Sequence, residues 1–374
     1  MPNKTEYLSN LTPLRGIAAL LVAVFHFEMA IARFIPAAQT MFFEKCYLMV
    51  DLFFIMSGFI MMHVYDETFT NSINKISLRK FFVARFARIY PLHFFALALL
   101  VILVLVFSPA GTYPNRIEDP SAILTNFLLI HTFYIHNIYT WNIPSWSISA
   151  EMVAYIFFPI IAIFINRKKA LSVIVLIIFI VAAYYSIMYL LPRKNPLYPE
   201  IPVPHNINTT YDYGSLRGVA GFIAGMLMYL VYQLPQFRNI FSKDIVAFLI
   251  CIALIVSMHF AVSDAWVVIL FAAIVISFAS NENYLHKICN NRVLQYLGDI
   301  SYSIYLMQIF FQEPFSKGLR LPDTIGFGRG KQNIDFSSGL MYCTIYLLLL
   351  IAVSSVTYYF IEKPCRRFIN RKWQ

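Results

Sequence analysis

The segment Pro13–Phe34 reads PLRGIAALLVAVFHFEMAIARF and decides the class of fold. It is long enough to cross a bilayer as a helix, because about 20 apolar residues span the hydrocarbon core. Arg15 and His26 are eleven residues apart within it. That spacing is about three helical turns, so both side chains lie on one face, roughly 16 Å apart. A charged residue at bilayer depth costs about 2.5 to 3.5 kcal/mol, so a chain that keeps one there usually uses it.

The composition extends this conclusion to the whole chain. Hydrophobic residues make up 59% of the sequence, charged residues only 13%, and the mean hydropathy is +0.66. These values indicate an all-α polytopic membrane protein. The net charge of +10 arises mainly from basic residues in short loops, which is the usual topogenic bias, so we expect no nucleic-acid partner. The five scattered cysteines lack a metal or redox spacing, and we expect one membrane domain over residues 1–374 with no metal site and no separate soluble domain.

Hydropathy gives eleven candidate spans. They lie near 13–34, 46–65, 89–109, 122–138, 146–165, 170–191, 215–234, 244–261, 265–281, 297–313 and 338–362. The weakest is 122–138, which is short and interrupted by two asparagines and two histidines. If it does not span, both termini are inside, with 18 Lys and Arg inside and 9 outside. If it spans, the counts become 12 and 15, against the positive-inside rule.

We therefore expect a bundle of ten transmembrane helices in which 122–138 is an external or re-entrant helical segment. Both termini would be cytoplasmic, and the protein would be a multi-pass component of the cytoplasmic membrane. Re-entrant backbone is tolerated at depth only where it lines a cavity, so the following loop, 141–149, is expected over a chamber.

Two ionisable groups in the first two spans are candidates for chemistry. A neutral imidazole in a low-dielectric chamber is a good general base near pH 7, so His26 is a candidate base; the alternative is a packing histidine bonded to a backbone carbonyl. Asp51 begins an apolar run and is expected to be functional or ion-paired, with Arg15 or His26 as possible partners. Ser57 and Gly58 in the same run favour close helix packing.

The basic segment 79–88 is a candidate phosphate site. Arg85 and Arg88 are neighbours on a helix, and together with Arg79 they present guanidinium groups that suit the phosphates of a nucleotide-bearing cofactor. Anchoring to lipid headgroups is the competing explanation.

The stretch Pro144–Tyr155 places polar groups on one side of an apolar helix. Ser147, Glu151 and Tyr155 recur every fourth residue. A carboxylate there can bind a sugar hydroxyl or orient a histidine, and Trp146 could stack on a sugar face or belong to the interfacial aromatic belt.

Several motifs occur together and in order along the chain. They are Arg15-x10-His26, VDLFFxxSGF over 50–59, RxxRIYP over 85–91, PSWSxSxE over 144–151, R-x4-F-x2-G over 217–225, SYSIYL over 301–306 and Glu362-Lys363-Pro364. This ordered set resembles the integral-membrane acyltransferase-3 family of membrane-bound O-acyltransferases that act on extracytoplasmic glycans.

The resemblance implies a ten-helix bundle that moves an acyl group, most often acetyl, from cytoplasmic acyl-coenzyme A to a hydroxyl of an extracytoplasmic carbohydrate such as a surface polysaccharide. His26 would be the base or proton carrier with Arg15 as its partner, and Asp51 and Glu151 would line the chamber. The remaining site residues would be the donor-side cations Arg79, Arg85 and Arg88 and the acceptor contacts Trp146, Ser147 and Tyr155.

One position departs from the family pattern, since Gln308 stands where members commonly carry histidine. Glutamine cannot titrate, so more of the acid–base work falls on His26. Acetyl-CoA would act as a donor substrate with no permanently bound cofactor, and the acceptor would be a glycan or a lipid-linked sugar. A proton-coupled transporter or flippase that uses His26, Asp51 and Glu151 as a relay is the alternative function. The sequence leaves open the acyl group, the acceptor hydroxyl, a covalent intermediate and the oligomeric state.

Overall fold

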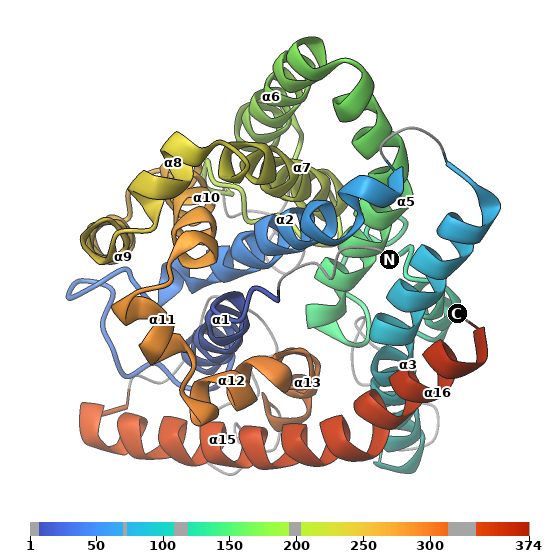
Figure 1. The fold of residues 1–374 in the computed structure, drawn as a ribbon. Coiled ribbons are helices and arrows are strands. Elements are labelled where there is room, and N and C mark those ends of the chain that lie inside the picture. Colours follow the sequence, from blue (N-terminus) through green and yellow to red (C-terminus); the bar gives the residue numbers. More distant parts are fainter. Residues whose placement is uncertain (1–6, 70–72, 108–118, 194–202, 313–333, 374) are drawn as a thin grey trace.

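The computed structural model describes residues 7–69, 73–107, 119–193, 203–312 and 334–373 (Figure 1). Within these ranges the regular elements are helices, and no strand is formed. In chain order they are α1 (Leu11–His26), η1 (Phe27–Ile31), η2 (Glu44–Leu48), α2 (Met49–Phe69), α3 (Lys75–Phe107), η4 (Pro120–Ala122), α4 (Ile123–Phe127), η5 (Ile143–Ser145), α5 (Trp146–Arg167), α6 (Lys169–Tyr185), η6 (Ser186–Leu190), α7 (Gly214–Tyr232), α8 (Pro235–Phe241), α9 (Asp244–His259), α10 (Asp264–Ser280), α11 (Tyr284–Cys289), α12 (Arg292–Asp299), α13 (Ser301–Met307), α15 (Phe336–Thr357), η7 (Tyr358–Glu362) and α16 (Lys363–Trp373).

Seven helices in the described part of the chain are long and apolar enough to cross a membrane. An eighth crossing is formed if α8 and α9, which are bent by 70° at their junction, are counted as one broken span. Helix α10 is apolar but has only 17 residues. The prediction of a polytopic helical membrane protein is therefore confirmed, whereas the predicted count of ten transmembrane helices is not supported.

The predicted span 297–313 accounts for part of this difference. The chain there forms two short helices, α12 and α13, which meet at Ile300. Gly298 lies against the backbone of α1, since a Cβ at this glycine would be 2.1 Å from the Thr12 carbonyl oxygen, and Ser301 Oγ donates to the Gly298 carbonyl at 2.7 Å. Hydropathy does not record this break, because the break depends on a contact with α1, which is far away in the sequence. Residues 108, 109 and 313, at the ends of two predicted spans, lie outside the described residues.

The segment 122–138 does not form a spanning helix. It contains the end of η4 and the short helix α4, followed by turns. His93 Nε2 on α3 bonds the Asn126 carbonyl at 2.9 Å, and the Thr132 and Ser149 hydroxyls are 2.7 Å apart. The segment is thus fixed to α3 on one side and to the start of α5 on the other.

His131 in this segment supports the start of α5. Burial lowers the pKa of its imidazole to about 3, so the ring is neutral at physiological pH. Its Nε2 lies 3.2 Å from Ser145 Oγ, which donates to the Asn142 carbonyl at 2.6 Å. A neutral ring in this position holds the turn that begins α5, from which Ser147, Glu151 and Tyr155 project.

Helices α2 and α7 pack in close contact at two glycines. A Cβ at Gly58 would lie 1.9 Å from the Phe222 carbonyl oxygen, and a Cβ at Gly225 would lie 1.9 Å from the Ile55 carbonyl oxygen. Small residues allow backbones to approach this closely in membranes. The predicted packing role of Gly58 is explained by this contact, and the two helices form the centre of the bundle (Figure 1).

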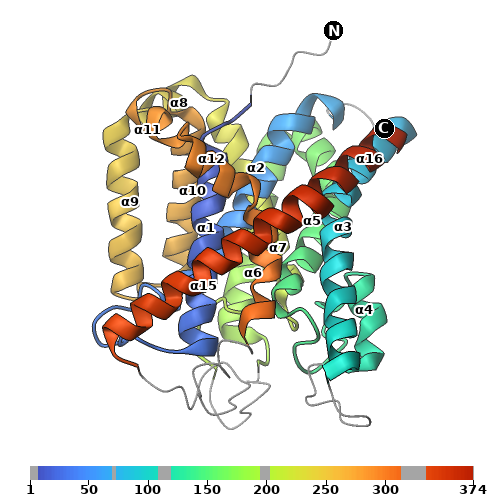
Figure 2. The same ribbon diagram turned by 90° about the horizontal axis from the view of Figure 1, so that it is seen from below.

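The last helical stretch is a single long element. Helices α15, η7 and α16 are continuous from Phe336 to Trp373, a length of 38 residues, and cross the bundle obliquely (Figure 2). Helix α1 begins and α16 ends on the same side of the bundle (Figure 2).

Candidate active site

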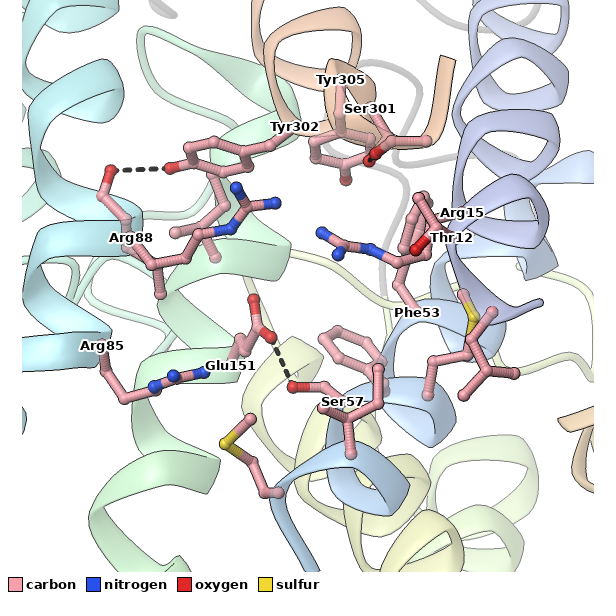
Figure 3. A pocket seen from close by; sticks show the side chains of 18 of the residues that line it. Thr12, Arg15, Phe53, Ser57, Arg85, Arg88, Glu151, Ser301, Tyr302 and Tyr305 are labelled. Carbon is pink, nitrogen blue, oxygen red and sulfur yellow. Dashed lines mark hydrogen bonds between the residues drawn. The ribbon is translucent and has the colours of Figure 1, made fainter. Parts of the chain in front are cut away.

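A cavity of about 540 Å³ lies between α1, α2, α3, α5, α13 and the junction of η7 with α16 (Figure 3). We call it the central cavity. Six of the ten residues predicted for the site line it, namely Arg15, Arg85, Arg88, Ser147, Glu151 and Tyr155. These side chains come from three helices that are far apart in the sequence, so the fold assembles most of the predicted site in one place.

Guanidinium groups outnumber carboxylates around the central cavity. Four arginines line it, Arg15, Arg85, Arg88 and Arg366, against the carboxylates of Glu151 and Asp299. Glu362 lies beside the lining and forms an ion pair with Arg88, and its other oxygen accepts from Ser303 Oγ at 2.9 Å. Among the described residues, four cations therefore face three carboxylates, and this part of the lining has an excess of positive charge.

Two of these arginines are poorly paired within the described residues. Arg15 has no hydrogen bond or ion pair to any described side chain or carbonyl. The Nε of Arg85 is buried without a hydrogen-bond partner, and its guanidinium lies over the rings of Tyr65 and Tyr155, at 5.8 and 5.6 Å from the ring centres. Because an unpaired guanidinium is costly away from water, these groups are suited to binding an anion.

Glu151 is the carboxylate at the centre of this arrangement. Its Oε1 accepts hydrogen bonds from Ser57 Oγ and from the Tyr155 hydroxyl, both at 2.6 Å. The two donor oxygens are themselves 3.0 Å apart. In Figure 3 the side chains of Arg15, Arg85 and Arg88 point into the same space as this carboxylate. Hydroxyl groups, a carboxylate and cations thus meet at one point, a set that can activate a hydroxyl and stabilise developing negative charge.

Ser147 and Tyr305 form a second hydroxyl pair on the cavity wall. Ser147 Oγ donates to the Tyr305 hydroxyl at 2.8 Å, and both residues line the cavity. Gln308 lies one turn beyond, where its Nε2 donates to the Tyr305 carbonyl at 2.9 Å while its Oε1 is buried without a partner. Gln308, at the position where the resemblance implies a histidine, therefore bonds its own helix.

Asp51 and Trp146 lie outside the lining of the central cavity. Asp51 is fully buried and forms a bidentate ion pair with Arg217, with Nε–Oδ1 at 3.0 Å and Nη2–Oδ2 at 2.5 Å. The expectation that Asp51 pairs with Arg15 or His26 is wrong in the described structure. The Arg217 guanidinium also lies 5.2 Å from the centre of the Trp146 ring, and Gly214 packs against that ring. The proposed sugar-stacking face of Trp146 is therefore covered.

A second ion-pair cluster adjoins the Asp51–Arg217 pair. Asp264, at the start of α10, accepts from Lys45 Nζ at 2.5 Å, from the Tyr47 hydroxyl at 2.6 Å and from the Ile207 amide at 3.0 Å. The Tyr47 carbonyl in turn accepts from Arg217 Nη2 at 3.1 Å. These contacts join four segments on the side of the bundle opposite the start of α1.

His26 and Arg79 also lie outside the cavity lining. His26 ends the α-helical part of α1, is 8% exposed, and its Nδ1 lies 2.9 Å from the Val22 carbonyl oxygen. Arg79 is exposed near the start of α3, six residues before Arg85. Six helical steps turn the side chain through about 600°, so Arg79 and Arg85 occupy different faces.

Sequence reasoning missed three residues of the site and its surroundings. The sequence analysis included Arg217 and Glu362 only as members of the ordered motifs, with no role in the site, and did not single out Arg366. The available signal for each was an ionisable side chain at helix depth. Within the described ranges, no group of three His, Cys, Asp or Glu side chains is placed to hold a metal ion.

Comparison with known proteins gives a family for the chain. A family model described as an acyltransferase domain matches residues 9–359. A curated relative, "Protein 2 in picA locus" of Rhizobium radiobacter, is 38% identical over 106 residues, which is 28% of this chain and 50% of that protein. The chain thus spans about half the length of this curated relative. No solved structure matches the chain. Because the family model covers most of the chain, including the cavity-lining residues from Leu11 to Tyr358, the protein belongs to this family of membrane acyltransferases.

Proposed function

We propose that the protein is an O-acyltransferase that moves an acetyl group from cytoplasmic acetyl-coenzyme A to a hydroxyl of an extracytoplasmic carbohydrate, such as a surface polysaccharide. The observation that carries the proposal is the excess of guanidinium groups around a cavity that also holds Glu151. Coenzyme A carries phosphates, for which guanidinium groups are strong bidentate partners. An acyltransferase needs an acyl donor. A thioester whose carrier is anionic would match the positive charge of the arginines that line this cavity.

The arrangement of the lining supports entry of the donor from the cytoplasmic side. By the positive-inside rule the start of α1 and the end of α16 would be cytoplasmic, and both lie on one side of the bundle (Figure 2). Leu8 before α1, His63 late in α2, Arg85 early in α3 and Asn370 in α16 all line the cavity. Their positions along these helices put one end of the cavity at this side.

The acceptor would approach from the other side. Ser147 and Tyr305 line the cavity close to the outer start of α5 and supply hydroxyls that can orient a sugar. His26 lies eleven residues beyond Arg15 on α1, about 16 Å further toward this side. Because its ring lies outside the central cavity, we assign it the role of proton carrier on the acceptor side. The acyl group would then pass from donor to acceptor within the bundle without either molecule being transported.

Release of free thiol from acetyl-CoA tests the proposal directly. Purified protein in detergent should release coenzyme A thiol, and isolated surface polysaccharide from the source cells should accelerate the release. A transporter that uses the same ionisable groups as a proton relay would release none. Absence of thiol release with and without polysaccharide would refute the acyl-CoA donor.

Replacing Arg85 with alanine should raise the KM for acetyl-CoA by about 10- to 100-fold, because a charged hydrogen bond is worth about 1.5 to 3 kcal/mol. Arg85 suits this test because it forms no ion pair among the described residues, so its removal leaves no carboxylate without a counter-ion. Steady-state kinetics with varied donor measures the effect. Arg292→Ala, an exposed substitution at the start of α12, is the matched control. A larger effect on the KM of the polysaccharide than on that of acetyl-CoA would contradict the donor role.

Replacing His26 with alanine should lower the rate of transfer to polysaccharide by about 100-fold, the lower part of the range for general-base catalysis. The protein should still insert in the membrane, because one buried ring is lost from an otherwise apolar helix end. Transfer of radiolabelled acetyl to polysaccharide measures the effect. If the His26→Ala variant transfers acetyl at the wild-type rate, His26 has no role in the reaction.

A further inference from the structure

Ser57 has a different environment from the other hydroxyl groups of the central cavity. Ser147 Oγ donates to the Tyr305 hydroxyl, and Ser301 Oγ donates to the carbonyl of Gly298 in the adjoining helix. Among the serines and threonines that line the cavity in the described structure, Ser57 alone donates to a carboxylate, at 2.6 Å from Glu151 Oε1. A hydroxyl bonded to a carboxylate can lose its proton as it attacks an electrophile, which is the arrangement of an activated nucleophile.

The fold presents this hydroxyl to the cavity rather than using it for packing. The neighbouring Gly58 makes the close contact with α7, where a Cβ would be 1.9 Å from the Phe222 carbonyl oxygen. Ser57 is on a different face of α2, is only partly buried and lines the cavity. Tyr155 also donates to Glu151 but is 3% exposed and lies beneath the Arg85 guanidinium. Ser57 is therefore the more accessible of the two donors.

Positive charge lies where an oxyanion would form. The guanidinium groups of Arg15, Arg85 and Arg88 point into the space next to Ser57 and Glu151 (Figure 3). Attack on a thioester carbonyl generates a tetrahedral oxyanion, and preorganised cations and donors stabilise it in a site sheltered from water. Arg15 forms no hydrogen bond or ion pair with a described residue, so its guanidinium group can bind an oxyanion without breaking such a contact.

We infer that Ser57 is a catalytic nucleophile that carries the acyl group as an ester, with Glu151 as its base. This inference rests on the proposed acyl-CoA donor. In the first step Ser57 Oγ bonds to the acyl carbon, the carbon–sulfur bond breaks, the serine proton passes to Glu151 and then to the departing thiolate. In the second step the acceptor hydroxyl oxygen bonds to the acyl carbon and the bond to Ser57 Oγ breaks. The acceptor proton passes to Glu151 and then to Ser57 Oγ. No oxidant or further reactant is required.

A seryl ester would separate the two half-reactions in time. The donor could leave toward the cytoplasm before the acceptor reaches the cavity, so a single cavity of about 540 Å³ need not hold a coenzyme A molecule and a carbohydrate together. Ligand pockets of this size enclose one drug-sized molecule. Sequential use of the cavity is therefore consistent with its volume.

The test uses purified full-length protein, acetyl-CoA and isotope-labelled coenzyme A, with no acceptor. The wild-type protein should exchange label into acetyl-CoA, and acid quenching followed by peptide mass spectrometry should find an acetyl group on Ser57. Ser57→Ala should lose the modification and lower the exchange rate at least 100-fold. Ser57→Cys should keep the modification as a thioester that neutral hydroxylamine removes. Ser301→Ala, which alters another cavity hydroxyl, should retain both exchange and the acetyl group on Ser57.

Two results would overturn the role of Ser57. The first is that Ser57→Ala exchanges label at a rate within tenfold of the wild-type rate. The second is that wild-type protein turns over acetyl-CoA but carries an acetyl group at another residue, or carries none. The second depends only on wild-type protein, so it holds even if Ser57→Ala misfolds. Failure of wild-type protein to bind acetyl-CoA in equilibrium dialysis would instead refute the donor assignment, which separates failure of the proposed function from failure of the nucleophile.

Discussion

Replacing Glu151 with glutamine should lower the rate of acyl transfer by about 1000-fold or more, within the range for loss of a general base. The Glu151 carboxylate accepts from both Ser57 and Tyr155, and an amide oxygen can keep both hydrogen bonds but cannot take a proton near neutral pH. The substitution therefore preserves packing and removes the basic group together with its negative charge. Thiol release from acetyl-CoA in the presence of polysaccharide measures the rate, and the melting temperature in detergent reports on folding.

Asp299→Asn is the matched control for this substitution. Asp299 also lines the central cavity, but it is exposed at the end of α12. Removing its charge changes the net charge of the cavity by the same amount as Glu151→Gln, so a purely electrostatic role for Glu151 predicts similar effects in the two variants. We expect Asp299→Asn to stay within tenfold of wild type. Equal losses in the two variants would contradict proton transfer by Glu151.

Replacing Arg217 with methionine should destabilise the protein by about 3 to 5 kcal/mol, because it strands the buried Asp51 carboxylate without a counter-ion. Both side chains are 0% exposed. Arg217 also donates to the carbonyls of Thr209 and Tyr47, at 3.2 and 3.1 Å, so the loops before α7 and α2 lose an anchor as well. The folded fraction during titration with sodium dodecyl sulfate in mixed micelles measures the change in the free energy of unfolding.

Two further variants separate the charge effect from lost packing. The double variant Arg217→Met with Asp51→Leu removes both charges, and it should recover much of the loss, since apolar replacements of buried ion pairs are often neutral. Arg238→Met breaks an exposed ion pair with Glu282, where the closest atoms are 3.3 Å apart, and should cost less than about 1 kcal/mol. If Arg217→Met and Arg238→Met lower the free energy of unfolding by the same amount, the buried Asp51–Arg217 pair stabilises the fold no more than an exposed ion pair does.

The sequence was sufficient to predict those parts of the site that depend on local spacing. Ser147, Glu151 and Tyr155 recur every fourth residue, and helical geometry alone puts them on one face. All three line the central cavity. Arg85 and Arg88 follow the same rule on α3. The class of fold was predictable for a related reason, since each span satisfies its own backbone hydrogen bonds and is recognisable from length and hydropathy.

Contacts between distant segments could not be predicted in this way. Asp51 pairs with Arg217, 166 residues later in the chain, and no local pattern identifies which of several buried cations is its partner. For the same reason the sequence did not predict that Arg88 pairs with Glu362, which is 274 residues away in the chain. The break between α12 and α13 depends on the close approach of Gly298 to α1, which is likewise a tertiary contact that hydropathy does not record.

The neighbouring residues Ser57 and Gly58 illustrate this limit most clearly. Both are small, and by composition both favour close packing between membrane helices. The structure separates them, because one step along a helix is a rotation of about 100°. Gly58 meets the backbone of α7, whereas Ser57 meets Glu151. Which of the two faces a partner helix is set by the position of α7, not by any property of α2.

The oblique element from Phe336 to Trp373 links the site to the surrounding bilayer. Its 38 residues amount to roughly 57 Å of helix, nearly twice the thickness of the hydrocarbon core, so it must tilt or extend beyond it. It carries both Glu362, which pairs with Arg88, and Arg366, which lines the cavity. Tilt of such a helix responds to hydrophobic mismatch. A change in the tilt of this element would alter the balance of charges around the central cavity, so membranes of different thickness are expected to affect the cavity differently.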